Sequence, residues 1–273
     1  MNPLITLLII QTFILFLFLY SDSNLFPSTS MNTTAKIETL MKYLQKLYPQ
    51  AQTELYFSNP YQCLVAVMLS AQTTDKQVNK VTRSLFSSLT KPEDIQKFSL
   101  TELEQALQSI NYYKNKAKYL QKLSYQLLEL NQKKDFKSLT SQEKKQKTKW
   151  GFFIPEEESE LVQLAGIGIK TAKVVEAVIF EKATVAVDTH VHRVLNRLNI
   201  VQTKTPLETS QKIEKLFPES LKKEANNLIV LFGRYHCTAK NPHCEECELK
   251  NWCKLSSFKD NSNRRKNNID IKC

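Results

Sequence analysis

The chain has 273 residues, 42% of them hydrophobic, which is enough apolar material for one large core or two smaller ones. Four glycines among abundant leucine and lysine favour an all-helical protein. The formal net charge of +11 suits a polyanionic partner such as DNA, although a compositional bias toward lysine would give the same charge.

The chain begins with a nearly continuous apolar stretch from Leu4 to Tyr20. It has about 17 residues, against the ~20 that a membrane-spanning helix requires. No Lys or Arg precedes it, no small-residue cleavage site follows it, and it contains no arginine, so it matches neither a signal peptide nor a transit peptide. Residues 1–30 are therefore interpreted either as a membrane anchor or as an artefact of a gene start placed before Met31.

Apolar periodicity then predicts a series of amphipathic helices. The first covers 34–48, and Pro60 opens the second. Asp75 is expected to cap the third helix, and the segment from Ser99 to Glu102 has the pattern of a capping box for the next one. A long helix is predicted from Ala117 to Leu130.

The segment 131–153 that follows is rich in lysine and shows no apolar periodicity. Such a composition predicts a solvated loop. An additional, non-specific contact with DNA is the alternative interpretation.

A helix, a tight turn and a second helix are predicted next. Residues 156–165 form the first helix, and Gly166-Ile167-Gly168 breaks it, because glycine admits a positive φ and has no Cβ to keep a ligand away from the backbone. The exposed N–H groups of this hairpin and the positive end of the second helix predict a phosphate site without base preference. A dinucleotide loop is excluded by the helix before Gly166, and a P-loop by the residue that separates Gly168 from Lys170.

Lys170 lies in the first turn of the second helix and begins its apolar stripe, whereas Lys173 and Glu176 are expected on the solvated face. A half-desolvated lysine at a helix N-terminus should have a pKa below the usual ~10.4. A neutral amine forms Schiff bases with sugar carbons. The alternative is a lysine whose ammonium group stays in water.

Asp188 follows a short apolar run, 185–187, and precedes a helix predicted from Thr189 to Leu198. This is an N-cap position, and capping alone would explain the residue. A carboxylate kept ionised there, near Lys170, would also accept its proton and stabilise an oxocarbenium-like sugar, although its charge opposes a lower lysine pKa.

Four of the six cysteines lie close together near the C-terminus: Cys237, Cys244, Cys247 and Cys253. Four thiolates at this spacing can surround one metal centre. Only one pair has the Cys-x2-Cys spacing typical of zinc, and disulfides would require an oxidising compartment. Basic residues around the loop, Lys240 among them, favour a structural metal beside a phosphate-contacting surface.

Two motifs now point to a family. Leu164-Ala-Gly-Ile-Gly-Ile-Lys-Thr-Ala172, followed by Val187-Asp-Thr-His190 and Arg193, resembles the helix-hairpin-helix DNA glycosylases, specifically the endonuclease III branch. The spacing of the four cysteines is similar to that of the [4Fe–4S] loop of this branch, which favours a cluster over zinc. The resemblance covers roughly residues 31–254. It implies that Lys170 and Asp188 are the catalytic pair and that the four cysteines hold the cluster.

The resemblance also implies several DNA contacts. Gln72, in Ser70-Ala-Gln-Thr-Thr-Asp75, would fill the gap left by an extruded base, and Tyr112 would belong to a loop that wedges into the duplex. Asn111 stands where the family usually has glycine but tolerates a positive φ. Tyr112 stands where the family has leucine or phenylalanine but can stack on an orphaned base. Tyr113 is the alternative wedge residue.

The expected architecture is therefore all-α, with two helical lobes and the hairpin where they meet. Residues 54–182 would form a helical bundle, residues 31–53 and 183–257 a discontinuous iron–sulfur lobe, and residues 258–273 a basic tail. Gly166, Ile167, Gly168 and Lys240 would contact double-stranded DNA, which would lie between the lobes.

The expected activity is that of a monomeric, bifunctional repair enzyme without a small-molecule cofactor. It would excise oxidised or ring-saturated pyrimidines and nick the abasic site by β-elimination, in the cytoplasm or nucleoid, or in the nucleus of a eukaryote. Three alternatives remain: an adenine-mismatch glycosylase, which usually lacks the lysine; a non-catalytic iron–sulfur DNA-binding protein; and a membrane-tethered electron carrier.

Overall fold

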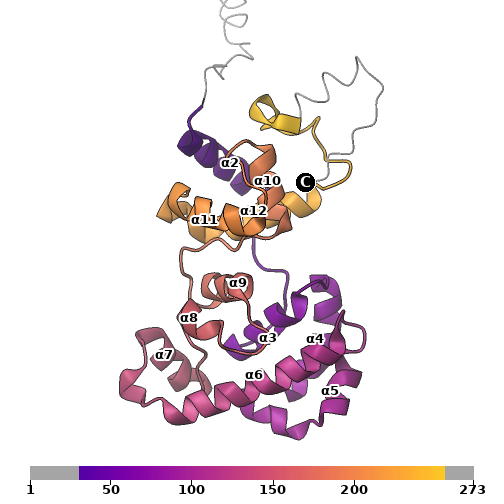
Figure 1. Cartoon of the computed structure of the whole chain (residues 1–273), viewed down its shortest axis with the longest axis vertical. Coiled ribbons are helices and arrows are strands. Elements are labelled where there is room, and N and C mark those ends of the chain that lie inside the picture. The colour runs from indigo at the N-terminus through magenta and orange to yellow at the C-terminus, as the bar shows by residue number, and fades with distance from the viewer. Residues whose placement is uncertain (1–30, 256–273) are drawn as a thin grey trace, which may run out of the picture.

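The computed structural model describes residues 31–255, and over this range the chain is helical and contains no strand (Figure 1). The apolar stretch Leu4–Tyr20 and the basic tail lie outside the described residues. Between residues 31 and 255 no helix is both long and apolar enough to cross a membrane. The helices are α2 (Thr33–Leu47), α3 (Pro60–Ser70), α4 (Asp75–Ser88), η1 (Pro92–Lys97), α5 (Leu100–Leu107), α6 (Tyr113–Lys133), η2 (Phe136–Ser138), α7 (Ser141–Trp150), α8 (Glu158–Leu161), α9 (Ile169–Ile179), α10 (Thr189–Arg197), α11 (Pro206–Leu216), α12 (Glu219–Tyr235) and η3 (Lys250–Trp252).

The lower lobe in Figure 1 is a bundle built around α3. Residues 60–69 of α3 are all buried, so this helix has no solvated face. Its deeply buried phenol, Tyr61, shares a hydrogen bond of 2.6 Å with Ser124 of α6, which satisfies both hydroxyls inside the core. The core of this lobe extends from Leu55 to Phe180 along the chain.

The upper lobe joins the beginning and the end of the described chain. Its core combines residues 37–44 of α2 with residues from Val185 to Leu249 (Figure 1). Helices α10 and α12 lie so close that a Cβ on Gly233 would be 2.8 Å from the Cβ of His190. Glycine at this position is what allows the two helices to pack. The prediction of an all-helical fold with two lobes is confirmed.

The prediction of a solvated loop at 131–153 is wrong. This segment contains η2 and α7, and Phe153 is fully buried. Helix α7 begins with a capping box formed by Thr140 and Glu143, and Gln146 accepts a hydrogen bond from the backbone of Ile154. The buried residues of this helix are Glu143 and Gln146. Because its inner face is polar, the sequence shows no helical repeat of apolar residues here.

Candidate active site

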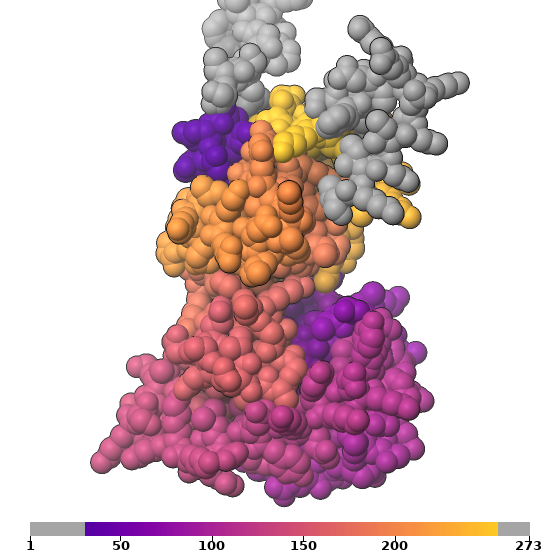
Figure 2. All heavy atoms as spheres, viewed as in Figure 1, coloured from indigo at the N-terminus to yellow at the C-terminus, as the bar shows by residue number. Residues whose placement is uncertain are grey.

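A cleft of about 2010 Å³ lies between the lobes, and the surface is hollowed where they meet (Figure 2). Its walls come from the turn after α3, the start of α4, the start of α9, the start of α10 and the end of α12. Lys170 and Asp188 both line it, as does Gln72. Segments far apart in the sequence thus converge on one concave surface.

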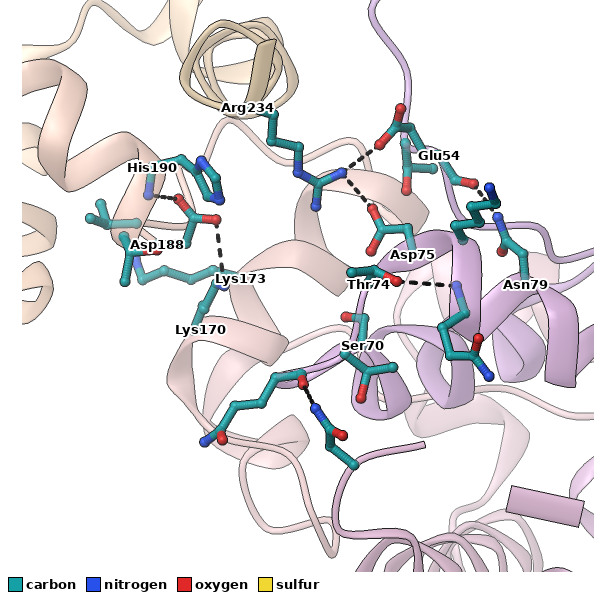
Figure 3. Close-up of a pocket in the computed structure, with 18 of the residues that line it drawn as sticks. Glu54, Ser70, Thr74, Asp75, Asn79, Lys170, Lys173, Asp188, His190 and Arg234 are labelled. Carbon is teal, nitrogen blue, oxygen red and sulfur yellow. Dashed lines mark hydrogen bonds and ion pairs between the residues drawn. The ribbon is translucent and has the colours of Figure 1, made fainter. Parts of the chain in front are cut away.

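Asp188 serves as the N-cap of α10 and also faces Lys170 (Figure 3). Its Oδ1 accepts hydrogen bonds from the backbone N–H groups of His190, at 2.8 Å, and Val191, at 2.9 Å. These bonds fix the carboxylate and leave Oδ2 at 3.7 Å from the Nζ of Lys170. Capping and electrostatic contact with the lysine are therefore two uses of one side chain.

The expectation that Lys170 is half-desolvated is not met. Its side chain is 59% exposed, whereas that of Asp188 is 13% exposed. Lys170 lies in the first turn of α9 and lines the cleft, where its ammonium group faces the carboxylate of Asp188.

The expectation that Lys173 and Glu176 face solvent is also wrong. The side chain of Lys173 is 17% exposed and forms ion pairs with Glu158 of α8, at 3.7 Å, and Glu214 of α11, at 3.5 Å. Glu176 is buried and pairs with Lys182 at 3.1 Å. This side of α9 is covered by residues that are distant in the sequence, and ion pairs replace the apolar contacts that would have marked it as buried.

The two glycines of the hairpin differ in their surroundings. Gly166 has φ +79°, and a Cβ there would lie 3.0 Å from the Cβ of Tyr119. Gly168 has a φ of −97°, which any residue can adopt, and a Cβ there would meet no other part of the described chain within 4 Å apart from the adjoining backbone. The side chain of Ile167 is buried, so the hairpin offers its backbone to a ligand. Gly166 is required by the turn, and Gly168 leaves space in front of the N-terminus of α9.

Gln72 and Tyr112 both adopt left-handed backbone conformations, with φ values of 55° and 60°. The amide of Asn111 donates a hydrogen bond of 2.5 Å to the carbonyl of Gln72, which joins the two turns. Asn111, which would tolerate a positive φ, does not have one, and the left-handed residue of this loop is Tyr112. Tyr112 is 64% exposed, whereas Tyr113 packs against the core of the bundle.

An ion pair across the cleft was not predicted. Arg234 of α12 contacts Asp75 at 2.7 Å and also contacts Glu54, so the upper lobe is bonded to the lower one (Figure 3). Asp75 was expected to cap α4, but Thr74 is the N-cap and Asp75 turns toward Arg234. No local pattern signals a contact between residues so distant in the sequence. The composition of the turn, with two adjacent cap-forming residues, would have allowed either assignment.

The four clustered cysteines lie in the segment that follows α12. Cys237 is buried, and its Sγ accepts a hydrogen bond of 3.4 Å from Arg197. Burial, first of all, and the charges of the other three thiolates together raise the pKa of Cys247 to about 11. Between residues 31 and 255 no three His, Cys, Asp or Glu side chains are arranged to hold a single metal ion.

The chemistry of these donors fits an iron–sulfur cluster. Four thiols from one short loop repel one another as thiolates, and a bound cationic iron core removes that cost. Lys240 lies exposed in the same loop, where its carbonyl accepts a hydrogen bond of 2.6 Å from Thr238. None of the four cysteines lines the interlobe cleft.

Comparison with known proteins identifies the same two regions. Residues 65–219 match the HhH-GPD superfamily of base excision DNA repair proteins, and residues 237–253 match the iron-sulfur binding domain of endonuclease III. Endonuclease III of Bacillus subtilis (strain 168) is 38% identical over 226 residues, which cover 82% of this chain and 94% of that protein. Endonuclease III of Escherichia coli (strain K12) is 32% identical over 230 residues, covering 84% and 100%.

Solved structures give the same result. The structure of a trapped endonuclease III–DNA covalent intermediate matches with a TM-score of 0.72 and 36% identity, covering 84% of this chain and 100% of that one. A structure of a non-covalent endonuclease III–DNA complex matches with the same TM-score and 35% identity, covering 84% and 99%.

Proposed function

This chain belongs to the endonuclease III family of [4Fe–4S] base-excision repair enzymes, and on that premise we propose which of its residues perform the reaction. The enzyme is a DNA N-glycosylase that also cleaves abasic sites. We assign Lys170 as the nucleophile and Asp188 as its proton acceptor and charge partner. The observation that carries this assignment is the distance of 3.7 Å between Nζ and the free carboxylate oxygen, in a cleft that both residues line.

In the proposed reaction the target nucleotide leaves the stack and enters the cleft. The amine of Lys170 attacks the sugar C1′, and the bond to the base breaks as the C1′–N bond forms. The departing base takes a proton from water, the amine loses its proton to Asp188, and this proton passes to O4′ as the sugar ring opens to a Schiff base. Transfer of a proton from C2′ to water then expels the 3′ phosphate by β-elimination. Asp188 is suited to this role because α10 holds its Oδ1 while Oδ2 stays available.

The exposure of Lys170 in the free protein is consistent with this mechanism if DNA completes the site. A bound duplex would cover the open edge of the cleft and remove water from the ammonium group. Desolvation of this kind favours the neutral amine. In this scheme the protein holds the carboxylate of Asp188 in place before DNA binds, and the bound DNA excludes water from Lys170.

We further propose the DNA contacts. The backbone of Gly166, Ile167 and Gly168 would bind a phosphate, since the hairpin exposes N–H groups and the side chain of Ile167 is buried. Gln72 would enter the gap left by the extruded base, and Tyr112, at 64% exposure, would stack beside it. Lys240 would add a phosphate contact outside the cleft.

The substrates would be oxidised or ring-saturated pyrimidines in double-stranded DNA. We infer that the enzyme acts as a monomer, because both walls of the cleft come from one chain. We infer that it acts in the compartment that holds the DNA.

The cluster would be held by Cys237, Cys244, Cys247 and Cys253. When bound, it links four points of the loop after α12 and neutralises their thiolates. Since these residues do not line the cleft, we assign the cluster a structural role in supporting the C-terminal end of α12 and the exposed Lys240 beside it.

Borohydride trapping tests the assignment of Lys170. Reduction during turnover of a duplex with an oxidised pyrimidine should give a covalent protein–DNA adduct, and Lys170→Ala should abolish it. Lys173→Ala is the matched control, since Lys173 also lines the cleft but is held by two glutamates. An adduct that persists in Lys170→Ala and disappears in Lys173→Ala would reverse the assignment.

The same assay on two other duplexes separates the rival functions. A duplex with adenine opposite an oxidised guanine should give neither excision nor adduct. Preferential excision of that adenine would favour the mismatch-glycosylase alternative, and binding without any excision would favour the non-catalytic one.

A further inference from the structure

Lys116 is a lysine buried inside the helical bundle. It lies in the first turns of α6 and is 5% exposed. Its Nζ donates hydrogen bonds to the carbonyl of Leu69 at 2.8 Å, the carbonyl of Ala71 at 2.6 Å and the hydroxyl of Thr73 at 3.2 Å. Burial lowers the pKa of this amine to about 8. A buried cation is costly unless its donors are satisfied, and here each of the three donors has an oxygen acceptor.

The three acceptors lie on both sides of Gln72. Leu69 and Ala71 are at the C-terminal end of α3, where backbone carbonyls have no partner within the helix and the helix dipole is negative. The ammonium group of Lys116 therefore acts as a cap for α3. On the other side of Gln72, the hydroxyl of Thr73 accepts a hydrogen bond from the same nitrogen.

Gln72 needs such support because of its own backbone. A residue other than glycine in the left-handed region, as here with φ 55°, costs about 1 kcal/mol or more and persists only when its surroundings hold it. Lys116 holds the turn from the inside, and Asn111 holds the carbonyl of Gln72 from the outside. Both come from the segment that carries Tyr112, so the two exposed side chains are positioned by one set of bonds.

We propose that Lys116 is a positioning residue for base excision, which holds the Ser70–Thr73 turn so that the side chain of Gln72 is presented at the edge of the cleft. This inference rests on the proposed role of Gln72. Lys116 does not touch DNA in this scheme, and its effect on the reaction passes through Gln72 alone.

A double-mutant cycle tests the proposal. Lys116→Met keeps the length of the side chain and removes its charge and donors, and Gln72→Ala removes the side chain that it positions. Each single variant should slow single-turnover base excision roughly ten- to a hundredfold, since a misplacement of about 1 Å can cost about a hundredfold in rate. The double variant should be no slower than either single one, because both changes remove the same contribution.

The controls separate positioning from general damage to the fold. Lys133→Met removes an exposed lysine from the last turn of the same helix and should leave excision unchanged. Borohydride trapping on a preformed abasic site should persist in Lys116→Met, since Lys170 is intact. Thermal unfolding shows whether each variant folds. If Lys116→Met does not fold, Thr73→Val, which removes only the outermost acceptor, takes its place in the cycle.

Two results would overturn the inference. Independent, multiplicative effects of the two substitutions would mean that Lys116 acts on stability and not through Gln72. A folded Lys116→Met that excises at the wild-type rate would mean that it positions nothing of consequence. If Gln72→Ala excised at the wild-type rate, the role proposed for Gln72 would be refuted, and with it the positioning role of Lys116. The assignment of Lys170 would be unaffected, because borohydride trapping tests it separately.

Discussion

Replacing Asp188 by asparagine separates the two uses of this side chain. Asparagine has the same shape and an amide oxygen that can accept the backbone bonds from His190 and Val191, now made to Oδ1 at 2.8 and 2.9 Å. Asparagine and aspartate are equally good N-caps, so Asp188→Asn should change the free energy of unfolding by only about 0.5 kcal/mol. Asp188→Ala removes the cap as well and should cost about 1 kcal/mol.

Asp188→Asn should affect catalysis more than stability, because it removes the negative charge that faces the nitrogen of Lys170, which becomes positively charged as it attacks the sugar. Two unit charges 3.7 Å apart attract by ~1 kcal/mol in water and ~4 kcal/mol at an effective dielectric constant of ~20. The lower figure suits the free enzyme, in which Lys170 is 59% exposed, and the higher one suits a cleft closed by DNA. Because ~1.4 kcal/mol is a factor of ten in rate, the expected loss ranges from roughly fivefold to several hundredfold.

Single-turnover excision, DNA binding and thermal unfolding should be measured on both variants. Asp188→Asn should bind DNA, unfold close to the wild-type temperature and excise slowly, whereas Asp188→Ala should add a loss of stability to the same loss of rate. Excision by Asp188→Asn at the wild-type rate would refute the electrostatic argument. Equal destabilisation by the two substitutions would refute the capping argument.

Three further predictions concern other parts of the molecule. Gly166→Ala should destabilise the fold by about 1–3 kcal/mol, because φ at this position is +79° and the added Cβ would press on Tyr119. Gly168→Ala should fold normally and lose DNA affinity, because its Cβ would occupy the open space before α9. Unfolding and DNA-binding titrations distinguish the two variants, and an unaffected affinity in Gly168→Ala would contradict the phosphate site. Burial opposes ionisation of Asp94, but hydrogen bonds from its neighbours outweigh burial and lower its pKa to about 2, below the value in the unfolded chain. Asp94→Asn should therefore lower the free energy of unfolding by about 2 kcal/mol at neutral pH, and urea titrations should show this difference shrinking as pH falls from about 4 toward 2. A difference that does not change with pH would contradict this prediction. Cys247→Ser should lower the iron content and visible absorption of the purified protein, measured by metal analysis and spectroscopy, and full iron retention would remove this residue from the ligand set.

The parts of the fold that could be predicted are those with a local signal. Two glycines separated by a single residue, in a chain with four, mark the hairpin. An aspartate between an apolar run and an amphipathic helix marks the cap at Asp188, and the Ser99–Glu102 capping box is present as expected. In each case the residues that determine the conformation are neighbours in the sequence.

The parts that could not be predicted depend on contacts between distant residues. Helix α7 packs through Glu143 and Gln146, so hydrophobic periodicity carries no trace of it. Lys173 is covered only because α8 and α11 bring glutamates to it, and Asp75 leaves its expected capping role because Arg234 reaches it from α12.

The core of the upper lobe combines α2 with α10–α12. This arrangement affects the order in which the two lobes can fold during synthesis. During translation the bundle around α3 is complete once residue 180 has left the ribosome, and all of its core residues are then available. Residues 37–44 must wait until the last helix has been synthesised before they can bury their apolar side chains. The nascent chain therefore carries the apolar side chains of residues 37–44 without their partners while the bundle around α3 folds behind them.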